Sequence, residues 1–244
     1  MKKVDKVYVL SVKKYTNRIK HIKNELRKNK IDFEFIFDFD PEKIPKKELK
    51  KFDQDELSIK HISLIKKHIR AWENAIKNKC KNILVFEDDV ILSKDFVNEI
   101  NKIMDERINY QKGKLIYLGG SDTKVKLREL ITGNKIFEKD IATTEAYITD
   151  FEACNLRIEA LKDRVISLPA DHLIKKIDLE KKIKHYWSFN ALVQQGSVIG
   201  AFRSELDKNR RKHSQTYNIL RYRWQKLRRR ELKTLLARFI KKCI

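Results

Sequence analysis

The chain has 244 residues, of which 37% are charged and 41% hydrophobic, and its formal net charge at pH 7 is +22. This length favours one large domain, with or without an appendage, over two full domains, and the periodic hydrophobic runs exclude a disordered chain. Because the sequence has no run of eighteen apolar residues and no signal-peptide hydrophobic segment, we expect a cytosolic protein. The positive charge requires a negatively charged partner: nucleic acid, an anionic membrane surface or phosphate-bearing substrates.

The opening of the chain predicts a strand followed by a helix. Apolar residues fill positions 7–10, and others then recur at helical spacing over 16–28. In a doubly wound sheet the first strand-to-helix turn faces a nucleotide, so Ser11, Asn17 and Arg18 are candidates to hydrogen-bond a base, a ribose or a phosphate. No glycine-rich fingerprint accompanies them. The alternative is that Arg18 is a solvated residue at the start of its helix.

Next in order come a predicted strand over 32–38 and an amphipathic helix over 59–76. In residues 82–91, an apolar run then ends in three consecutive carboxylates, Glu87, Asp88 and Asp89. In α/β domains ligands bind at the carboxyl ends of strands, and hard carboxylate oxygens suit a divalent cation that is shared with a substrate phosphate. The alternative is a surface turn whose acids cap a helix that starts near Ser93.

The second half of the chain continues the alternation of helices and strands, which predicts the α/β fold class. In order, the elements are a helix capped by Ser93, a strand over 115–118, short strands and loops over 121–144, a strand over 145–149, a helix capped by Asp150, a helix from 169, and strand and loop over 185–199. The irregular region is of the kind that shapes an acceptor site. Asp171 is either an N-cap or a carboxylate that projects into the cleft as a base.

The composition changes past Arg203, so we predict a helical appendage over residues 204–244. From Lys208 to Ile244 there are fourteen Lys and Arg against one acid, which gives this segment +13 of the total +22. Apolar residues recur on one helical face, with basic residues around them: Tyr217, Leu220, Trp224, Leu227, Leu235 and Phe239, with Arg221, Arg223, Arg228, Arg229, Arg230 and Lys233. The pattern is typical of a helix on an anionic membrane. The alternative is a helix that packs on the catalytic domain or on a neighbouring subunit.

Several short motifs occur along the chain. They are Val9-Leu10-Ser11 with Asn17-Arg18, His68-Ile69-Arg70-Ala71-Trp72, Phe86-Glu87-Asp88-Asp89-Val90, Ala146-Tyr147-Ile148, Pro169-Ala170-Asp171, and Gln194 to Ile199. Together, over about residues 5–200, they resemble glycosyltransferase family 25, the bacterial lipooligosaccharide galactosyltransferases and their collagen-modifying relatives. The chain departs from the family pattern where Lys60-His61-Ile62 stands in place of Gly-Glu-Ile and Lys67 in place of the serine before His68.

The resemblance implies a GT-A-like catalytic domain over residues 1–203, with a Rossmann-type mixed sheet flanked by helices. It implies transfer of a hexose, galactose, from a UDP-sugar to lipooligosaccharide or another glycan, with inversion and with Mn²⁺ or Mg²⁺ held by Glu87 and Asp89. The donor-binding candidates are Ser11, Asn17, Arg18, His68, Asp88 and Gln195. Asp171, and after it Glu145, is the candidate for the base that takes the acceptor proton. With a lipid-linked acceptor, the tail would hold the enzyme on the cytoplasmic face of a bacterial inner membrane.

Two other functions fit parts of the sequence. Arginines around Tyr222 and Trp224 are compatible with a nucleic-acid-binding protein, but the buried acidic strand argues against nucleic acid as a partner. The three consecutive acids are also compatible with a two-metal phosphoesterase, but no His-rich cluster accompanies them.

Overall fold

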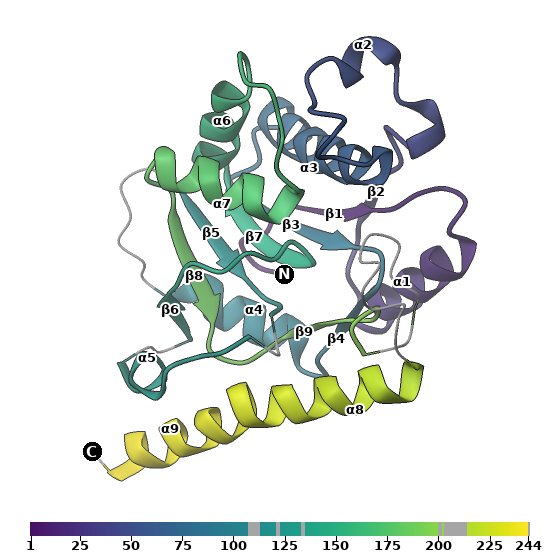
Figure 1. The fold of residues 1–244 in the computed structure, drawn as a ribbon. Helices are drawn as coiled ribbons and strands as arrows, with labels where there is room; N and C mark the ends of the chain where they lie inside the picture. Colours follow the sequence, from purple (N-terminus) through teal and green to yellow (C-terminus); the bar gives the residue numbers. More distant parts are fainter. Residues whose placement is uncertain (107–112, 121–122, 133–134, 200–201, 203–213, 244) are drawn as a thin grey trace.

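A mixed sheet of seven strands runs through the molecule (Figure 1). The computed structural model describes residues 1–106, 113–120, 123–132, 135–199, 202 and 214–243. In spatial order the strands are β2 (Glu34–Ile36), β1 (Lys6–Leu10), β3 (Asn82–Glu87), β7 (Ala146–Asp150), β5 (Lys114–Tyr117), β8 (Lys184–Ser188) and β6 (Ile136–Glu138). β7 and β6 run antiparallel to their neighbours, and the other five strands run in one direction. The carboxyl ends of β1, β2 and β3 therefore meet at one edge.

Helices cover both faces of the sheet. The helices are α3 (Ile59–Lys77), α6 (Phe151–Ala160) and α7 (Ala170–Glu180) in one core, and α1 (Thr16–Lys28) and α4 (Phe96–Asp105) in the other. Alternate residues of one strand belong to different cores, as Val85 and Phe86 of β3 do. Because both faces are buried, the central strands β1 and β3 are apolar on both sides, at Val7–Leu10 and Ile83–Phe86. The predicted α/β class, with a mixed sheet flanked by helices, is confirmed.

The segment after β3 forms a second, two-stranded sheet that the sequence pattern did not predict. β4 (Val90–Leu92) pairs antiparallel with β9 (Val193–Gln195), and Ser93 N donates to Leu192 O at 2.9 Å. The predicted role of Ser93 as a helix cap is therefore wrong. α4 begins three residues later, after Asp95, and no side chain caps it.

The connections hold further short elements. They are a 3₁₀ turn at Pro41–Lys43, α2 (Lys46–Leu49), and α5 (Leu127–Thr132), a helix in the region predicted to hold short strands and loops. β2 is shorter than its predicted range. The predicted cap at Asp150 is confirmed, since Asp150 Oδ1 accepts a hydrogen bond from Ala153 N at 3.0 Å.

The described part of the tail is one long helical run beside the sheet and its helices (Figure 1). α8 (Gln215–Lys226) passes through a π-helical turn, Leu227–Glu231, into α9 (Leu232–Cys243), which contacts α5. One face of the run is buried, at Tyr222, Arg230, Thr234 and Ala237. The predicted boundary between residues 203 and 204 lies outside the described residues. Within the described ranges, every helix is too short or too polar to cross a membrane.

Candidate active site

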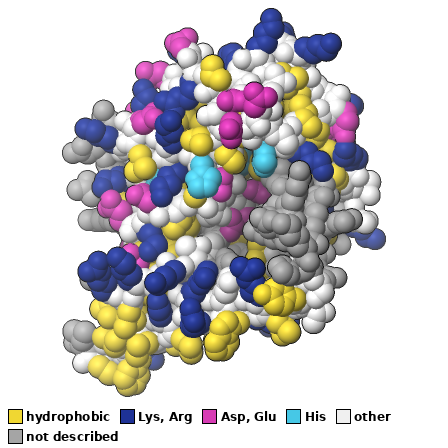
Figure 2. Space-filling model, viewed as in Figure 1, with side chains coloured by type: hydrophobic (Ala, Val, Ile, Leu, Met, Phe, Trp, Pro, Cys, Tyr) yellow, Lys and Arg dark blue, Asp and Glu magenta, His cyan; other side chains and the backbone are white. Residues whose placement is uncertain are grey.

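A cavity of about 440 Å³ lies at the carboxyl ends of β1 and β3. It is lined by eight of the ten site residues predicted from the sequence: Ser11, Arg18, Glu87, Asp88, Asp89, Glu145, Asp171 and Gln195. They come from the ends of β1, β3 and β9, from the first turns of α1 and α7, and from the residue before β7. Figure 2 shows acidic side chains in the hollow of this face. The edge of the sheet thus gathers residues that are far apart in the sequence.

Asp88 is hydrogen-bonded to two of the three candidate residues of the first strand-to-helix turn. Ser11 Oγ donates to Asp88 Oδ2 at 2.7 Å, and Arg18 Nη1 donates to Asp88 Oδ1 at 3.0 Å. Burial raises the pKa of Asp88, although the charge of Arg18 and the bond from Ser11 oppose the shift. Burial also acts against the charge on Arg18, but the carboxylates of Asp89 and Asp88 outweigh it and raise the pKa of Arg18. These residues form one charged cluster.

Glu87 and Glu145 are neighbours at the ends of β3 and β7. Thr144 Oγ1 donates to Glu87 Oε1 at 2.8 Å, and Glu87 N donates to Glu145 O at 2.9 Å. Burial and then the charge of Asp89 raise the pKa of Glu87 to about 8. Burial and the neighbouring carboxylate of Asp89 thus both act against the charged form of Glu87.

Two glycines hold the carboxylate of Glu145 in place. Gly120 N donates to Glu145 Oε1 at 2.6 Å. A Cβ on Gly119 would stand 2.1 Å from the same oxygen, so a larger residue at that position would displace Glu145. Glu145 is 7% exposed. Its carboxylate is thus fixed against the turn that follows β5.

Asp89 is held by the turn that follows β9. Ser197 N donates to Asp89 Oδ2 at 3.1 Å, and Gly196 N donates to the backbone oxygen of Asp89 at 2.6 Å. The second carboxylate oxygen, Oδ1, is buried and has no hydrogen-bond partner in the described part of the chain. A buried oxygen without a partner is costly, which makes it a candidate ligand for a cation.

The carboxylates of Glu87 and Asp89 are suited to bind a divalent cation together with a substrate. In the described ranges, His, Cys, Asp and Glu side chains do not form a group of three or more that could hold a metal ion by themselves. Mg²⁺ does not need such a cage, since proteins commonly bind it through one or two carboxylates together with substrate phosphates and water. The buried oxygen of Asp89 that lacks a partner, close to the partly buried Glu87, matches that kind of site.

Asp171 lines the cavity from the first turn of α7. The N-cap of α7 is Pro169, and no side chain caps the helix. Asp171 Oδ1 accepts a hydrogen bond from His172 N at 2.9 Å. Burial lowers the pKa of His61, another residue of the cavity, and the charge of Asp171 opposes that shift. Asp171 is therefore not the N-cap of α7 but a residue of the cavity lining, and its role as a base stays a prediction.

The family model of glycosyltransferase family 25 (LPS biosynthesis protein) matches residues 4–174, more than half of the chain. This chain belongs to glycosyltransferase family 25. The predicted enzyme class, a glycosyltransferase of the lipopolysaccharide-biosynthesis type, is thereby confirmed. Among solved structures, the galactosyltransferase LgtC in complex with donor and acceptor sugar analogs is similar at 11% identity and a TM-score of 0.44, over 88% of this chain and 95% of LgtC. The comparison with curated proteins finds no match.

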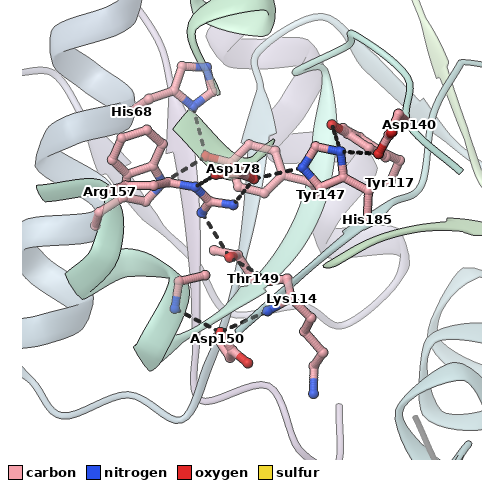
Figure 3. A network of polar contacts seen from close by, with 12 residues as sticks. His68, Lys114, Tyr117, Asp140, Tyr147, Thr149, Asp150, Arg157, Asp178 and His185 are labelled. Carbon is pink, nitrogen blue, oxygen red and sulfur yellow. Dashed lines mark hydrogen bonds and ion pairs between the residues drawn. The ribbon is translucent and has the colours of Figure 1, made fainter. Parts of the chain in front are cut away.

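The histidine of the family-25 Ser-His element, His68, does not line the cavity. It is 1% exposed, and its Nδ1 lies 2.9 Å from the hydroxyl of Tyr147, which also accepts from Trp72 Nε1 (Figure 3). Complete burial and then the charge of Arg157 lower the pKa of His68 to about 3. The prediction that His68 binds the donor is therefore corrected, because it is a neutral core residue on the sheet side of α3.

Asn17, of the family-25 Asn-Arg pair, is not part of the cavity either. It is exposed on α1, whereas the next residue, Arg18, lines the cavity. Successive residues of a helix point about 100° apart, so the two side chains face different directions. Asn17 thus lies outside the cavity lining, and its contact with the donor stays a prediction.

Sequence reasoning left several residues of the cavity unassigned: Tyr15, Lys60, His61, Lys67, Thr144, His172 and Ser197. Lys67 is buried, and its Nζ donates to Asp40 Oδ1 and to Asp38 O, each at 2.8 Å. Burial lowers the pKa of Lys67, and Asp40 opposes the shift. The signal for Lys67 was present in the sequence, since it replaces the serine of the family-25 motif.

Proposed function

We propose that this protein is a metal-dependent, inverting glycosyltransferase that moves a hexose, galactose, from its UDP donor to a hydroxyl of lipooligosaccharide or another cell-surface glycan. The observation that carries the proposal is the meeting of the acidic end of β3, Arg18 and Asp171 in one cavity. A diphosphate donor suits this combination, because it needs positive charge at the phosphates and a carboxylate near the acceptor. Galactose and the lipooligosaccharide acceptor come from the family resemblance of the sequence.

The donor would bind at the tip of β3 and at the first strand-to-helix turn. Ser11 and Arg18 offer hydrogen-bond donors there, and Gln195 lines the same cavity from β9. When bound at Glu87 and Asp89, Mg²⁺ or Mn²⁺ would neutralise negative charge on the leaving diphosphate. Arg18 Nη1, which lies 3.9 Å from Asp89 Oδ2, adds a fixed positive charge beside that position.

Transfer with inversion is a single displacement. The acceptor oxygen forms a bond to the anomeric carbon while the bond from that carbon to the phosphate oxygen breaks, and UDP leaves with the electron pair. The hydroxyl proton passes to a carboxylate. We assign this role to Asp171 because its carboxylate lines the cavity and is partly exposed, whereas the Glu145 carboxylate is buried and bonded to Gly120 N.

A screen of nucleotide sugars with a glycan acceptor tests the proposal. We expect turnover of a UDP-hexose, its loss when EDTA removes the cation, and its recovery when Mn²⁺ is returned. Undiminished turnover after chelation would contradict the metal dependence, and a preference for another nucleotide would contradict the donor. The anomeric configuration of the product, measured by NMR, decides between inversion and retention.

The outer face of the tail supports an anionic membrane surface as partner. Its large apolar side chains are 39–67% exposed: Tyr217, Leu220, Trp224, Leu227, Leu232, Leu235, Leu236 and Phe239. Figure 2 shows hydrophobic side chains along the tail, with Lys and Arg beside them. Each basic residue close to an anionic surface contributes up to about 1 kcal/mol. The protein would thus bind peripherally to the cytoplasmic face of a bacterial inner membrane, where a lipid-linked acceptor is within reach.

The inner face of the tail has a different partner. Arg230 is buried and Lys233 Nζ donates to Val125 O at 2.6 Å, so these two residues do not belong to the predicted basic outer face. The tail therefore packs on the catalytic domain with one side and leaves the other side for a membrane.

Vesicle binding tests the membrane proposal. Replacing two outer residues together, Trp224→Ser and Leu235→Ser, is expected to weaken binding to phosphatidylglycerol vesicles about tenfold or more, because the buried apolar area is lost. Val165→Ser is the matched control, since Val165 is 67% exposed but lies outside the tail. Equal binding by the double variant and the control would contradict the proposal.

A further inference from the structure

Arg230 lies buried in the contact between the tail and the catalytic domain. It belongs to the π-helical turn between α8 and α9 and is 2% exposed. Its Nη2 donates to Ser188 O and to Phe189 O, the second at 2.8 Å. Its guanidinium carbon lies 3.7 Å from the centre of the Trp187 ring. One tail residue therefore holds the end of β8.

Burying the Arg230 guanidinium in this contact costs free energy. Nε and Nη1 of Arg230 are buried without a hydrogen-bond partner in the part of the chain that the structure describes. Burial lowers the pKa of Arg230 to about 9. Apolar residues in place of buried charges are often neutral or stabilising, so a methionine would pack here at a lower cost. The guanidinium group is therefore better explained by what it holds than by packing.

Trp187 extends this contact to the active site. Its Nε1 donates to Gly119 O at 2.7 Å, and its Cζ2 is 3.3 Å from the place where a Cβ on Gly120 would stand. Gly120 has a φ of +67°, and its N–H is the group that binds the Glu145 carboxylate. The two-glycine turn thus lies between Trp187 on one side and Glu145 on the other.

The chain that leaves β8 gives a second connection. After the two carbonyls that Arg230 binds, Leu192 N and Val193 N both donate to Leu118 O, at 3.1 and 3.2 Å. β9 then ends at Gln195, which lines the cavity. The same arginine therefore supports two walls of the site.

We propose that Arg230 is a positioning residue for glycosyl transfer: by holding Trp187 and the end of β8, it fixes the two-glycine turn that sets the Glu145 carboxylate in the cavity. This inference rests on the proposed function of the cavity. In this proposal, the inner face of the tail positions residues of the active site, and the outer face binds the membrane.

Three variants of the full chain test the proposal. Arg230→Met keeps an unbranched apolar side chain and removes the guanidinium with its charge and hydrogen bonds, and Arg230→Lys keeps the charge and a donor. Arg238→Met is the matched control, because Arg238 is an exposed tail arginine whose Nη2 donates to Asn190 Oδ1 at 2.5 Å, in the same segment after β8 that Arg230 binds. For each variant, the measurements are hydrogen exchange of the Gly120 amide, kcat and KM with a soluble acceptor, and binding to phosphatidylglycerol vesicles.

In Arg230→Met, exchange of the Gly120 amide is expected to rise about tenfold and kcat to fall about tenfold, with the KM for donor and vesicle binding within about twofold of wild type. For Arg230→Lys, the exchange rate of the Gly120 amide and kcat should lie between those of the wild type and of Arg230→Met. For Arg238→Met, both quantities should match those of the wild type. Unchanged exchange and kcat in Arg230→Met overturn the proposal, as does a fall in kcat that only follows a loss of folded protein. If the methionine variant does not fold, the lysine variant is judged by the same criteria.

The two proposals fail in different ways. If the wild-type protein turns over no nucleotide sugar, the proposed function fails, and the exchange of the Gly120 amide still decides whether Arg230 fixes the turn. If transfer is measured but Arg230→Met leaves it and the exchange unchanged, only the role of Arg230 is overturned.

Discussion

The cavity and the polar network of Figure 3 both bury carboxylates beside an arginine, but they satisfy them differently. In the network, Arg157 donates from Nε and Nη2 to the two oxygens of Asp178 at 2.7 and 2.6 Å, and His185 Nε2 lies 2.9 Å from Asp178 Oδ2. In the cavity, Asp88 and Asp89 at the end of β3 share Arg18, and Asp89 Oδ1 has no partner among the described residues.

The pKa values follow the same division. Burial acts to raise the pKa of Asp178, but the charge and hydrogen bonds of Arg157 outweigh it, and the pKa is lowered. The pKa of Glu87 is instead raised to about 8 by burial and by the charge of Asp89. A fully hydrogen-bonded network of opposite charges stabilises a fold, whereas a cluster of carboxylates in a cavity with one oxygen left without a partner indicates a ligand site. Changes in the network should therefore affect folding, and changes in the cavity should affect chemistry.

The largest effect is expected from Asp89→Asn. The rate of transfer should fall by about 10³-fold or more, because the variant loses a ligand of the cation that neutralises the leaving diphosphate. The free energy of unfolding should stay the same or rise, since one of several repelling charges is removed. Activity assays and urea unfolding measure the two quantities, with Asp95→Asn, at an exposed acid of the same region, as control. An active variant, or one that unfolds, would contradict this division.

Arg157→Met breaks the network instead. It leaves Asp178 buried without its partner, so the free energy of unfolding should fall by about 3–5 kcal/mol in urea titrations. Adding Asp178→Leu should restore most of the loss, because the second change removes the unpaired charge. A single variant as stable as the wild type would show that the pair does not stabilise this fold.

Asp171→Asn tests whether Asp171 acts as the base without contributing to donor binding. We expect kcat to fall about 10²-fold with an unchanged KM for the UDP-sugar, because the carboxylate acts on the acceptor proton. Glu145→Gln should have a smaller effect on kcat. If Glu145→Gln lowers kcat more than Asp171→Asn does, Glu145 is the base instead of Asp171.

The pH dependence of stability tests the comparison at His68, which belongs to the network of Figure 3 through its contact with Tyr147. Its pKa falls from the ordinary 6.5 to about 3 on folding, so between these values the unfolded chain binds more protons than the folded one. The free energy of unfolding should therefore decrease as the pH drops below about 6.5, by about 2 kcal/mol at pH 5 from this group. Urea titrations at pH 7 and pH 5 should show a weaker pH dependence for His68→Phe. An unchanged dependence would assign the effect to other groups.

Much of the fold and of the site could be predicted from local patterns. The apolar run of β3 followed by Glu87, Asp88 and Asp89 indicated both a buried strand and its charged end. Ser11 and Arg18 could be placed because parallel strands bring their carboxyl ends together. Asp171 was found through its motif, since local sequence alone did not distinguish a cap from a base.

The remaining features depend on contacts that a local pattern does not contain. β4 has a partner about a hundred residues away, and its pairing moved the start of α4 beyond Ser93. His68 faces the core rather than the cavity because of the rotation of α3. The charge of Arg230 placed it among the predicted membrane-facing basic residues, but the tail buries it on Trp187.

The central claim is that the acidic end of β3 binds a cation and a UDP-sugar together. Calorimetric titration of UDP into the wild-type protein and into Asp89→Asn, each with and without Mn²⁺, tests it most directly. We expect Mn²⁺ to strengthen UDP binding to the wild type about tenfold or more and to have no effect on Asp89→Asn. Equal affinity of the wild type for UDP with and without Mn²⁺ would contradict the claim.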